Sequence, residues 1–236
     1  QKIMWFAKSS GTTNNISKYI PVTKDSLYNC HFKAGKDMIS VYNQNFSAQN
    51  IYKGKGIMLG GSLEKIKQKD YVDGDLSAIL IHNFPFWVNK HRVPDIETSL
   101  MQNWELKLEN IVQQSIKENI TNITGVPSWM LILLKKVLEV SKKNNILEVW
   151  PNLEVYFHGG VNFDPYRKIF DKIIPSKSMN YLEGYNASEG FFAIQDKQLS
   201  EGMLLLMNHG IFYEFIDIKD LKNKNTITLN EVKKKH

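Results

Sequence analysis

A run of small polar residues near the start of the chain, residues 9–13, has the composition of an anion-binding loop. It follows the hydrophobic segment Ile3–Phe6, which is typical of a strand, and Lys18 can add a positive charge nearby. Its four hydroxyl groups and closely spaced backbone N–H groups could surround a phosphate. The G-x-x-x-x-G-K-[ST] pattern of a Walker A loop is not present, and composition alone also fits a flexible linker. The candidate phosphate ligands are Ser9, Ser10, Gly11, Thr12 and Thr13.

A carboxylate, Glu189, lies in a second small and polar segment, residues 184–190, between two hydrophobic stretches. Carboxylate oxygens suit Mg²⁺, which proteins commonly share with substrate phosphates. Taken alone, Glu189 fits a solvent-facing loop residue better than a metal ligand. Together with the hydroxyl-rich run and the glycine turn at Gly159–Gly160, it suggests a Mg²⁺–nucleotide site.

The segments around these residues alternate between strand and helix. The predicted elements are a strand at 122–124, a helix capped by Ser128 to about 143, a strand at 153–157, a helix at 164–173 and a strand from 179. This β-α-β-α-β order predicts a parallel sheet, and ligands bind outside the carboxyl ends of such strands. If the sheet is parallel at each of them, the loops at 9–13, 125–127, 158–160 and 185–189 can share one rim.

The rest of the chain predicts further helices and a different kind of sheet. Helices are expected at about 24–45, capped by Thr23, at 75–83 and at 95–117, with a glycine-bounded strand near 53–61. Hydrophobic stretches at 191–194, 203–207, 211–216 and 226–229 are separated only by turns, which predicts an antiparallel meander. The expected fold class is α/β: a largely parallel sheet flanked by helices, followed by this meander. The first region, about 1–120, carries the phosphate loop and helices, and about 121–236 carries the sheet core and meander.

Composition excludes several classes of protein. The chain has 236 residues, a formal net charge of +6 and 42% hydrophobic residues, which is ordinary for a globular protein. A single cysteine excludes a disulfide scaffold and a cysteine-based zinc site, and favours a reducing, cytoplasmic compartment. The apolar stretches are too short to span a membrane, and scattered lysines mixed with acidic residues argue against nucleic-acid binding.

Five motifs, in this order, resemble the auxin-responsive acyl acid amido synthetase family, particularly its bacterial members. This family is part of the adenylate-forming superfamily of acyl-CoA synthetases and luciferases. The similarity extends over essentially the whole chain. The motifs are residues 6–13, 125–129, 150–153, 158–166 and 185–190.

The resemblance implies a two-step reaction that uses ATP and Mg²⁺. A carboxylic acid attacks the α-phosphate of ATP to give an acyl-adenylate, and the amine of an amino acid then displaces AMP to form an amide. Two alternatives stay open: transfer to a thiol such as coenzyme A, and a non-catalytic binding module that kept the fold. The sequence leaves the acid, the acceptor and the oligomeric state open.

The resemblance also implies a role for each matching residue. Residues 9–13 would cradle the β- and γ-phosphates, Ser188 would contact the α-phosphate, and Glu189 would hold Mg²⁺. Ser188 and Lys18 are the candidate catalytic residues. Gly159, Gly160 and Val161 would lie along adenine with Tyr185 beside it, and Val126 and Trp129 would face the acyl pocket.

The family's pattern extends beyond this chain. A third nucleotide motif, whose Asp binds the ribose hydroxyls, is expected after residue 236, followed by a small C-terminal domain. Sequence before the phosphate loop is expected as well. The chain is therefore expected to be the central part of a longer enzyme and to be inactive alone.

Overall fold

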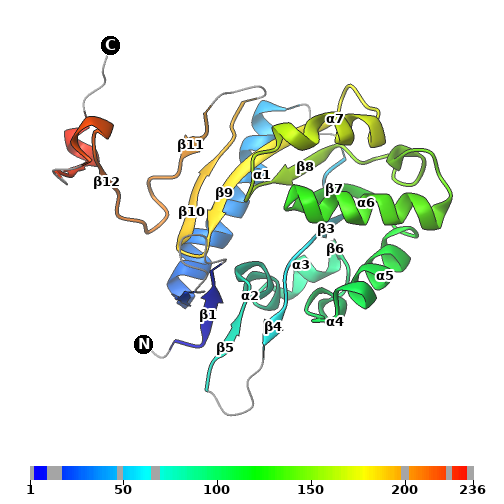
Figure 1. The fold of residues 1–236 in the computed structure, drawn as a ribbon, viewed down its shortest axis with the longest axis horizontal. Helices are drawn as coiled ribbons and strands as arrows, with labels where there is room; N and C mark the ends of the chain where they lie inside the picture. The colour runs from blue at the N-terminus through cyan, green and yellow to red at the C-terminus, as the bar shows by residue number, and fades with distance from the viewer. Residues whose placement is uncertain are drawn as a thin grey trace.

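A seven-stranded sheet forms the centre of the computed structural model, which describes residues 3–9, 18–46, 50–64, 70–197, 202–221 and 225–232. Its strand order is β11-β10-β9-β8-β7-β3-β6 (Figure 1). The strands are β3 (Lys55–Met58), β6 (Arg92–Val93), β7 (Ile120–Gly125), β8 (Val155–His158), β9 (Asn180–Ala187), β10 (Gly190–Ile194) and β11 (Leu204–Leu205).

The sheet is parallel from β6 through β3, β7 and β8 to β9, and antiparallel from β9 through β10 to β11. Helix α6 (Pro127–Ser141) connects β7 to β8, and helix α7 (Asp164–Ile173) connects β8 to β9. The predicted β-α-β-α-β order and the α/β fold class are therefore confirmed. The helix at 164–173 has the predicted bounds, and Pro165 occupies its first turn, where a missing N–H costs nothing.

Helices cover both faces of the sheet, as the side chains of β8 show. Tyr156 packs into the larger core with α6, α7 and α5 (Trp104–Ser115). Its neighbours Val155 and Phe157 pack into a second cluster with α1 (Phe32–Asn45) on the other side. Because successive strand residues point to opposite faces, burial of both sets requires helices on both sides.

A separate four-stranded sheet, ordered β2-β1-β5-β4, holds the beginning of the chain. Its strands are β1 (Trp5–Lys8), β2 (Tyr19–Val22), β4 (Leu63–Glu64) and β5 (Val72–Gly74), and α2 (Leu76–His82) packs on it. The strand before residues 9–13 therefore does not belong to the parallel central sheet on which the prediction of one shared rim depends. Residues 9–13 follow β1, whose hydrogen bonds are to β2 and β5 and not to the central strands.

Three predicted helix boundaries change. The helix expected at 24–45 is present, but it begins with a π-helical segment, η1 (Ser26–His31), before α1. As predicted, Thr23 caps it, because its Oγ1 accepts a hydrogen bond of 3.0 Å from the Ser26 N–H. Ser128, in contrast, lies inside α6, whose N-cap is Val126.

The helix expected at 95–117 is two helices, α4 (Ile96–Ser99) and α5. Asp95 caps α4 by accepting from the Thr98 N–H, and Asn103 caps α5 by accepting from the Leu106 N–H. Each cap satisfies a backbone donor that a helix start leaves free, so two caps specify two starts. The remaining short helices are α3 (Phe86–Lys90) and η2 (Ile146–Glu148).

The predicted meander is only partly present. β10 and β11 continue the central sheet, whereas β12 (Glu214–Phe215) and β13 (Ile227–Thr228) pair in a sheet of their own. Figure 1 shows this pair, with the short helices η3 (Ile218–Asp220) and η4 (Leu229–Glu231), apart from the central sheet. Within the described ranges, no helix combines the length and apolarity needed to cross a membrane.

Candidate functional site

The carboxyl ends of β7 and β8 bring two of the predicted segments together. Gly125 at the end of β7 pairs with His158 at the end of β8, and His158 pairs with Glu183 of β9. A Cβ atom placed on Gly160 would lie 3.4 Å from Cγ2 of Val126. The Val126 segment and the Gly159–Val161 segment therefore lie side by side at one rim of the sheet, as the sequence predicted.

Close packing and backbone conformation explain the glycines in this rim. A Cβ atom on Gly159 would lie 2.2 Å from the carbonyl oxygen of Gly184. Only glycine therefore lets the chain after β8 pass this close to β9. Gly160 has a φ of +83°, a conformation that side chains disfavour. Val161 and Tyr185 are exposed beside this turn. A flat ligand could lie against this backbone without meeting side chains from the glycines.

The ring of His158 packs beside the rim, against the connection from β8 to α7. It stacks on Phe163 with ring centroids 4.2 Å apart and is only 6% exposed. Burial, and the positive charge of Arg167, lower the pKa of His158 to about 4. Neither ring nitrogen has a hydrogen-bond partner among the described residues. His158 is therefore a neutral, stacked side chain at neutral pH.

Ser188 and Glu189 lie beyond the end of β9, a strand that is longer than the sequence suggested. Tyr185 and Ala187, expected in a loop, are strand residues, and Ala187 pairs with Gly190 of β10. Ser188 and Glu189 thus form the two-residue turn of a hairpin that extends beyond the rim. This corrects the expectation that residues 185–189 form a loop at the level of Gly159.

An exposed carboxylate, Glu189, faces a cavity of about 200 Å³ at the tip of this hairpin. The cavity is lined by Thr23, Asp25, Ser26, Cys30, Glu189, His209, Gly210 and Ile211. Nearby, Nδ1 of His31 and Oδ1 of Asn186 are 3.0 Å apart, and the Phe191 N–H donates to Sγ of Cys30 at 3.3 Å. Segment η1 therefore holds the hairpin in place. Burial raises the pKa of the Cys30 thiol, which fits the structural role expected for it.

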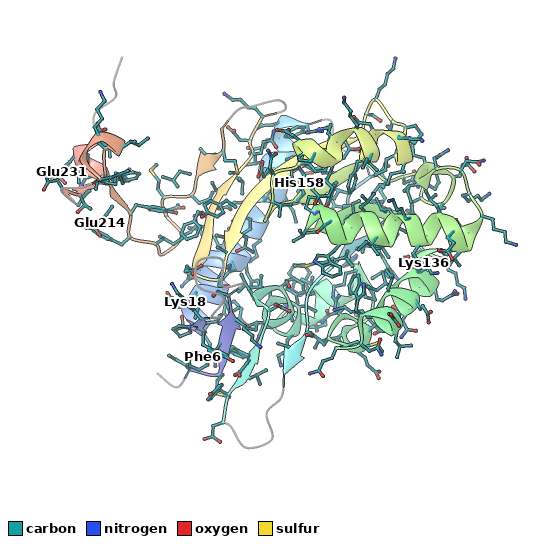
Figure 2. All side chains as sticks on the ribbon, viewed as in Figure 1. Phe6, Lys18, Lys136, His158, Glu214 and Glu231 are labelled. Atoms are coloured by element: carbon teal, nitrogen blue, oxygen red, sulfur yellow. The ribbon has the colours of Figure 1, made fainter. Side chains whose placement is uncertain are left out.

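Ser9 and Lys18 close the hairpin formed by β1 and β2. The Ser9 N–H donates to the Lys18 carbonyl at 2.9 Å, and Oγ of Ser9 accepts from the Lys18 N–H at 3.0 Å. Figure 2 shows Lys18 beside β1, with an exposed side chain. The other candidate phosphate ligands, Ser10, Gly11, Thr12 and Thr13, lie outside the described residues. The strand β2 leads directly into Thr23 and η1, which line the cavity of Glu189.

Comparison with known proteins identifies the family. The GH3 family N-terminal domain matches residues 1–179. The chain belongs to the GH3 family. The family predicted from the five motifs is therefore confirmed. No curated protein matches the chain significantly in sequence.

Solved structures show the fold of this GH3 chain at low sequence identity. A GH3.15 acyl acid amido synthetase matches with a TM-score of 0.72 and 11% identity, over 99% of this chain and 49% of that one. The same enzyme in complex with 2,4-DB matches with a TM-score of 0.72 and 12% identity, over the same shares. A 2-hydroxyisobutyryl-CoA ligase in complex with 2-HIB-AMP and CoA matches with a TM-score of 0.52 and 12% identity, over 86% and 41%. The chain thus has the fold of adenylate-forming enzymes and spans about half the length of the synthetase.

An aromatic pair lies beside the rim at the start of α6 in this GH3 chain. Val126 is the N-cap of α6, and Trp129 is 48% exposed. The ring of Trp129 meets the ring of Trp104, from the start of α5, edge to face with centroids 4.6 Å apart. Val126 and Trp129, which were predicted to face an acyl pocket, therefore lie on one helical turn, and Trp104 packs against Trp129.

Sequence reasoning missed Lys107 altogether. It lies on α5, is 2% exposed, and donates from Nζ to the carbonyl oxygens of Gly60 at 2.7 Å and Gly61 at 2.8 Å. Burial lowers the pKa of Lys107 to about 8, and the charge of Asp75 opposes this shift. One signal was available: Lys107 precedes the buried Ile111 by four residues, which places both on one helix face.

The residues present fit Mg²⁺ only as an ion shared with a phosphate ligand. Over the described part of the chain, no group of three or more His, Cys, Asp or Glu side chains could hold a metal ion. Glu189 is an exposed carboxylate at the hairpin tip. Mg²⁺ often takes one or two carboxylates, with phosphate oxygens and waters completing its coordination. Glu189 suits that arrangement and does not suit a closed, all-protein metal cage.

Proposed function

We propose that the full-length protein activates a carboxylic acid with ATP and transfers the acyl group to the amine of an amino acid. In the first step a carboxylate oxygen attacks the α-phosphorus and pyrophosphate leaves. In the second step the amine nitrogen attacks the acyl carbon, AMP leaves, and the nitrogen loses a proton. The observation that carries this proposal is the strand β9, which joins the glycine rim at its middle to the Ser188–Glu189 turn at its end.

The spacing along β9 suits an extended nucleotide. Ser188 follows Tyr185 by three residue steps, which in an extended chain corresponds to roughly 10 Å. Adenine would lie on the Gly159–Val161 backbone beside Tyr185, and the α-phosphate would reach Ser188. Residues 9–13, which begin next to the described Ser9, would receive the β- and γ-phosphates.

The charges needed for adenylation would come from three groups. The ATP phosphates carry several negative charges that repel an incoming carboxylate, so the site must supply opposing charge. Mg²⁺, when bound, would supply most of it, with Glu189 as its protein ligand. Lys18, on the hairpin that carries Ser9, would add a cation near the leaving pyrophosphate.

The acid would lie against Val126, Trp129 and Trp104. These side chains present an apolar and aromatic wall next to the rim, which favours an acid with an aromatic or hydrophobic body. Its carboxylate would then point toward the α-phosphate at Ser188. In this proposal the chain is the central part of the ATP-binding domain and acts in the cytoplasm, where a free thiol such as Cys30 stays reduced.

A thiol acceptor is the second candidate. The structural likeness to a CoA ligase favours it, because that enzyme shares the fold over 86% of this chain. Both reactions begin with the same acyl-adenylate and differ only in the nucleophile that displaces AMP. The rim, the hairpin and the aromatic wall serve either reaction.

A pyrophosphate-release assay on the full-length protein tests the proposal, with carboxylic acids and amino acids crossed and CoA as a separate acceptor. We expect release that depends on both an acid and an amino acid, and Glu189→Ala should lower it at least about 10-fold. The matched control is Glu139→Ala, because Glu139 is also exposed but lies on α6 in a pair with Lys136. Release with CoA alone would favour the thiol acceptor. No release with any acid, and no ATP-induced rise in melting temperature, would refute the adenylation proposal.

A further inference from the structure

One short segment, residues 59–62, connects the central sheet directly to the four-stranded sheet. It leaves the central sheet at the end of β3 and enters the small sheet at β4. On one side, the Leu59 N–H donates to the Thr124 carbonyl of β7 at 2.9 Å. On the other, the Ser62 N–H donates to Oδ2 of Asp75 at 3.0 Å, and the Asp75 N–H donates to the Ser62 carbonyl at 3.1 Å. We call residues 59–62 the crossover.

Packing around the crossover leaves no room for other side chains. A Cβ atom on Gly60 would lie 2.6 Å from Cδ1 of Ile81, and one on Gly61 would lie 1.8 Å from Oδ2 of Asp75. The Gly61 N–H donates to Oγ of Ser77 at 2.9 Å. The two glycine carbonyls point the other way, to the ammonium group of Lys107. Lys107 therefore pairs with two consecutive carbonyl oxygens of the crossover.

The small sheet links the crossover to the hairpin that contains Ser9 and Lys18. Asp75, which holds Ser62, comes directly after the last residue of β5. β5 pairs in parallel with β1, with Ala7 opposite Gly74, and Ser9 follows β1. A displacement of the crossover would therefore move β5, β1 and the β1–β2 hairpin as one unit relative to the rim at Gly159.

We propose that Lys107 is a positioning residue that sets where the β1–β2 hairpin lies relative to the rim of the central sheet. The inference rests on the proposed function for its effect on ATP, since the hairpin would bind the phosphates and the rim would bind adenine. Lys107 itself is too buried to contact the nucleotide. It acts by fixing the distance between the two halves of the ATP site.

The ammonium group of Lys107 supports a role for this side chain beyond packing. A buried ammonium group is costly, and apolar residues of similar volume often replace buried charges with no loss of stability. The lowered pKa of Lys107 is the sign of that cost. A lysine at this place is explained by what its three N–H donors can reach, which is a pair of consecutive carbonyls on the crossover.

The test compares Lys107→Met with the matched control Lys136→Met in the full-length protein. Lys136 is a lysine of α6 whose partner, Glu139, is exposed. For Lys107→Met we expect the KM for ATP to rise about 10-fold, with the KM for the acid within about 2-fold of wild type, because only the phosphate half of the site moves. For Lys136→Met we expect both constants unchanged. An unchanged KM for ATP, or equal rises for both substrates, would overturn the proposal.

Hydrogen exchange separates failure of this inference from failure of the proposed function. It is measured on the same variants without substrate, and we expect Lys107→Met to speed exchange at the crossover and also in β1 (Trp5–Lys8). Faster exchange at the crossover alone, or at neither place, would overturn the positioning role whether or not wild type is active. If Lys107→Met does not fold, Lys107→Gln replaces it, because its shorter side chain lacks the ammonium group that reaches both carbonyls. The same two outcomes then decide.

Discussion

The buried charge of Lys107 predicts an unusual dependence of stability on pH. The pKa of this lysine falls from 10.5 to about 8 in the folded chain, and the side chain is 2% exposed. The difference between the two values corresponds to roughly 3 kcal/mol of cost for folding with the charged form. Lys107→Met removes both the charge and its cost.

The direction of this pH dependence follows from the number of protons that the folded and unfolded chains bind. Below about pH 8, Lys107 is protonated in both the folded and the unfolded chain, and the full cost is present. Between about pH 8 and 10.5 the unfolded chain binds a proton that the folded chain does not, so stability increases with pH. From about pH 7 to 9.5 we expect wild type to gain about 2 kcal/mol relative to Lys107→Met.

Urea unfolding of both chains at about pH 7 and 9.5 measures this difference. The buried tyrosines Tyr42, Tyr156 and Tyr181 have raised pKa values because of burial, so they lower stability at still higher pH. They are present in both chains and cancel when the two curves are subtracted. A difference between the chains that stays constant with pH, or that shrinks as pH rises, would refute the reasoning.

Three further predictions concern the rim of the central sheet. Gly159→Ala should lower the free energy of unfolding by about 2 kcal/mol or more, because its Cβ would lie 2.2 Å from the Gly184 carbonyl; chemical denaturation measures the loss, and an unchanged midpoint would contradict the packing. Burial lowers the pKa of His158 to about 4, so wild type should lose stability as pH falls from about 6.5 to 4, whereas His158→Phe, which keeps a ring on Phe163, should lose less; equal acid midpoints would count against a neutral His158. Trp129→Ala should raise the KM for the acid several-fold and leave the KM for ATP within about 2-fold, and steady-state kinetics with the opposite pattern would remove it from the acid pocket.

The β-α-β-α-β core was predictable because its signals are local. Pro165 marks the start of α7, and the hydrophobic stretch at 153–157 has the length of a buried strand. The small sheet was not predictable in this way. β5 is three residues long, and its parallel pairing with β1 joins segments that are more than 60 residues apart in the chain.

In the candidate site, too, features with local sequence signals were predictable and features set by tertiary packing were not. The glycines at 159 and 160 indicate a turn by composition alone, and the structure gives each a reason to be glycine. Lys107 was missed because a lysine on a helix is usually a solvent-facing residue, and only tertiary packing brings two carbonyls to its ammonium group. The end of β9 was assigned to a loop because small and polar residues disfavour strands, yet pairing with β10 keeps it extended.

The hairpin of β9 and β10 also limits how this part of the chain can change length. Inserting or deleting one residue between Glu183 and Ala187 would turn every following side chain to the opposite face of the sheet. A compensating bulge is already present on the partner strand, where Phe192 lies between two paired neighbours. Changes of two residues preserve the faces, whereas single-residue changes do not. Homologous chains should therefore differ in length here by even numbers, and an odd difference should coincide with the gain or loss of a bulge in β10.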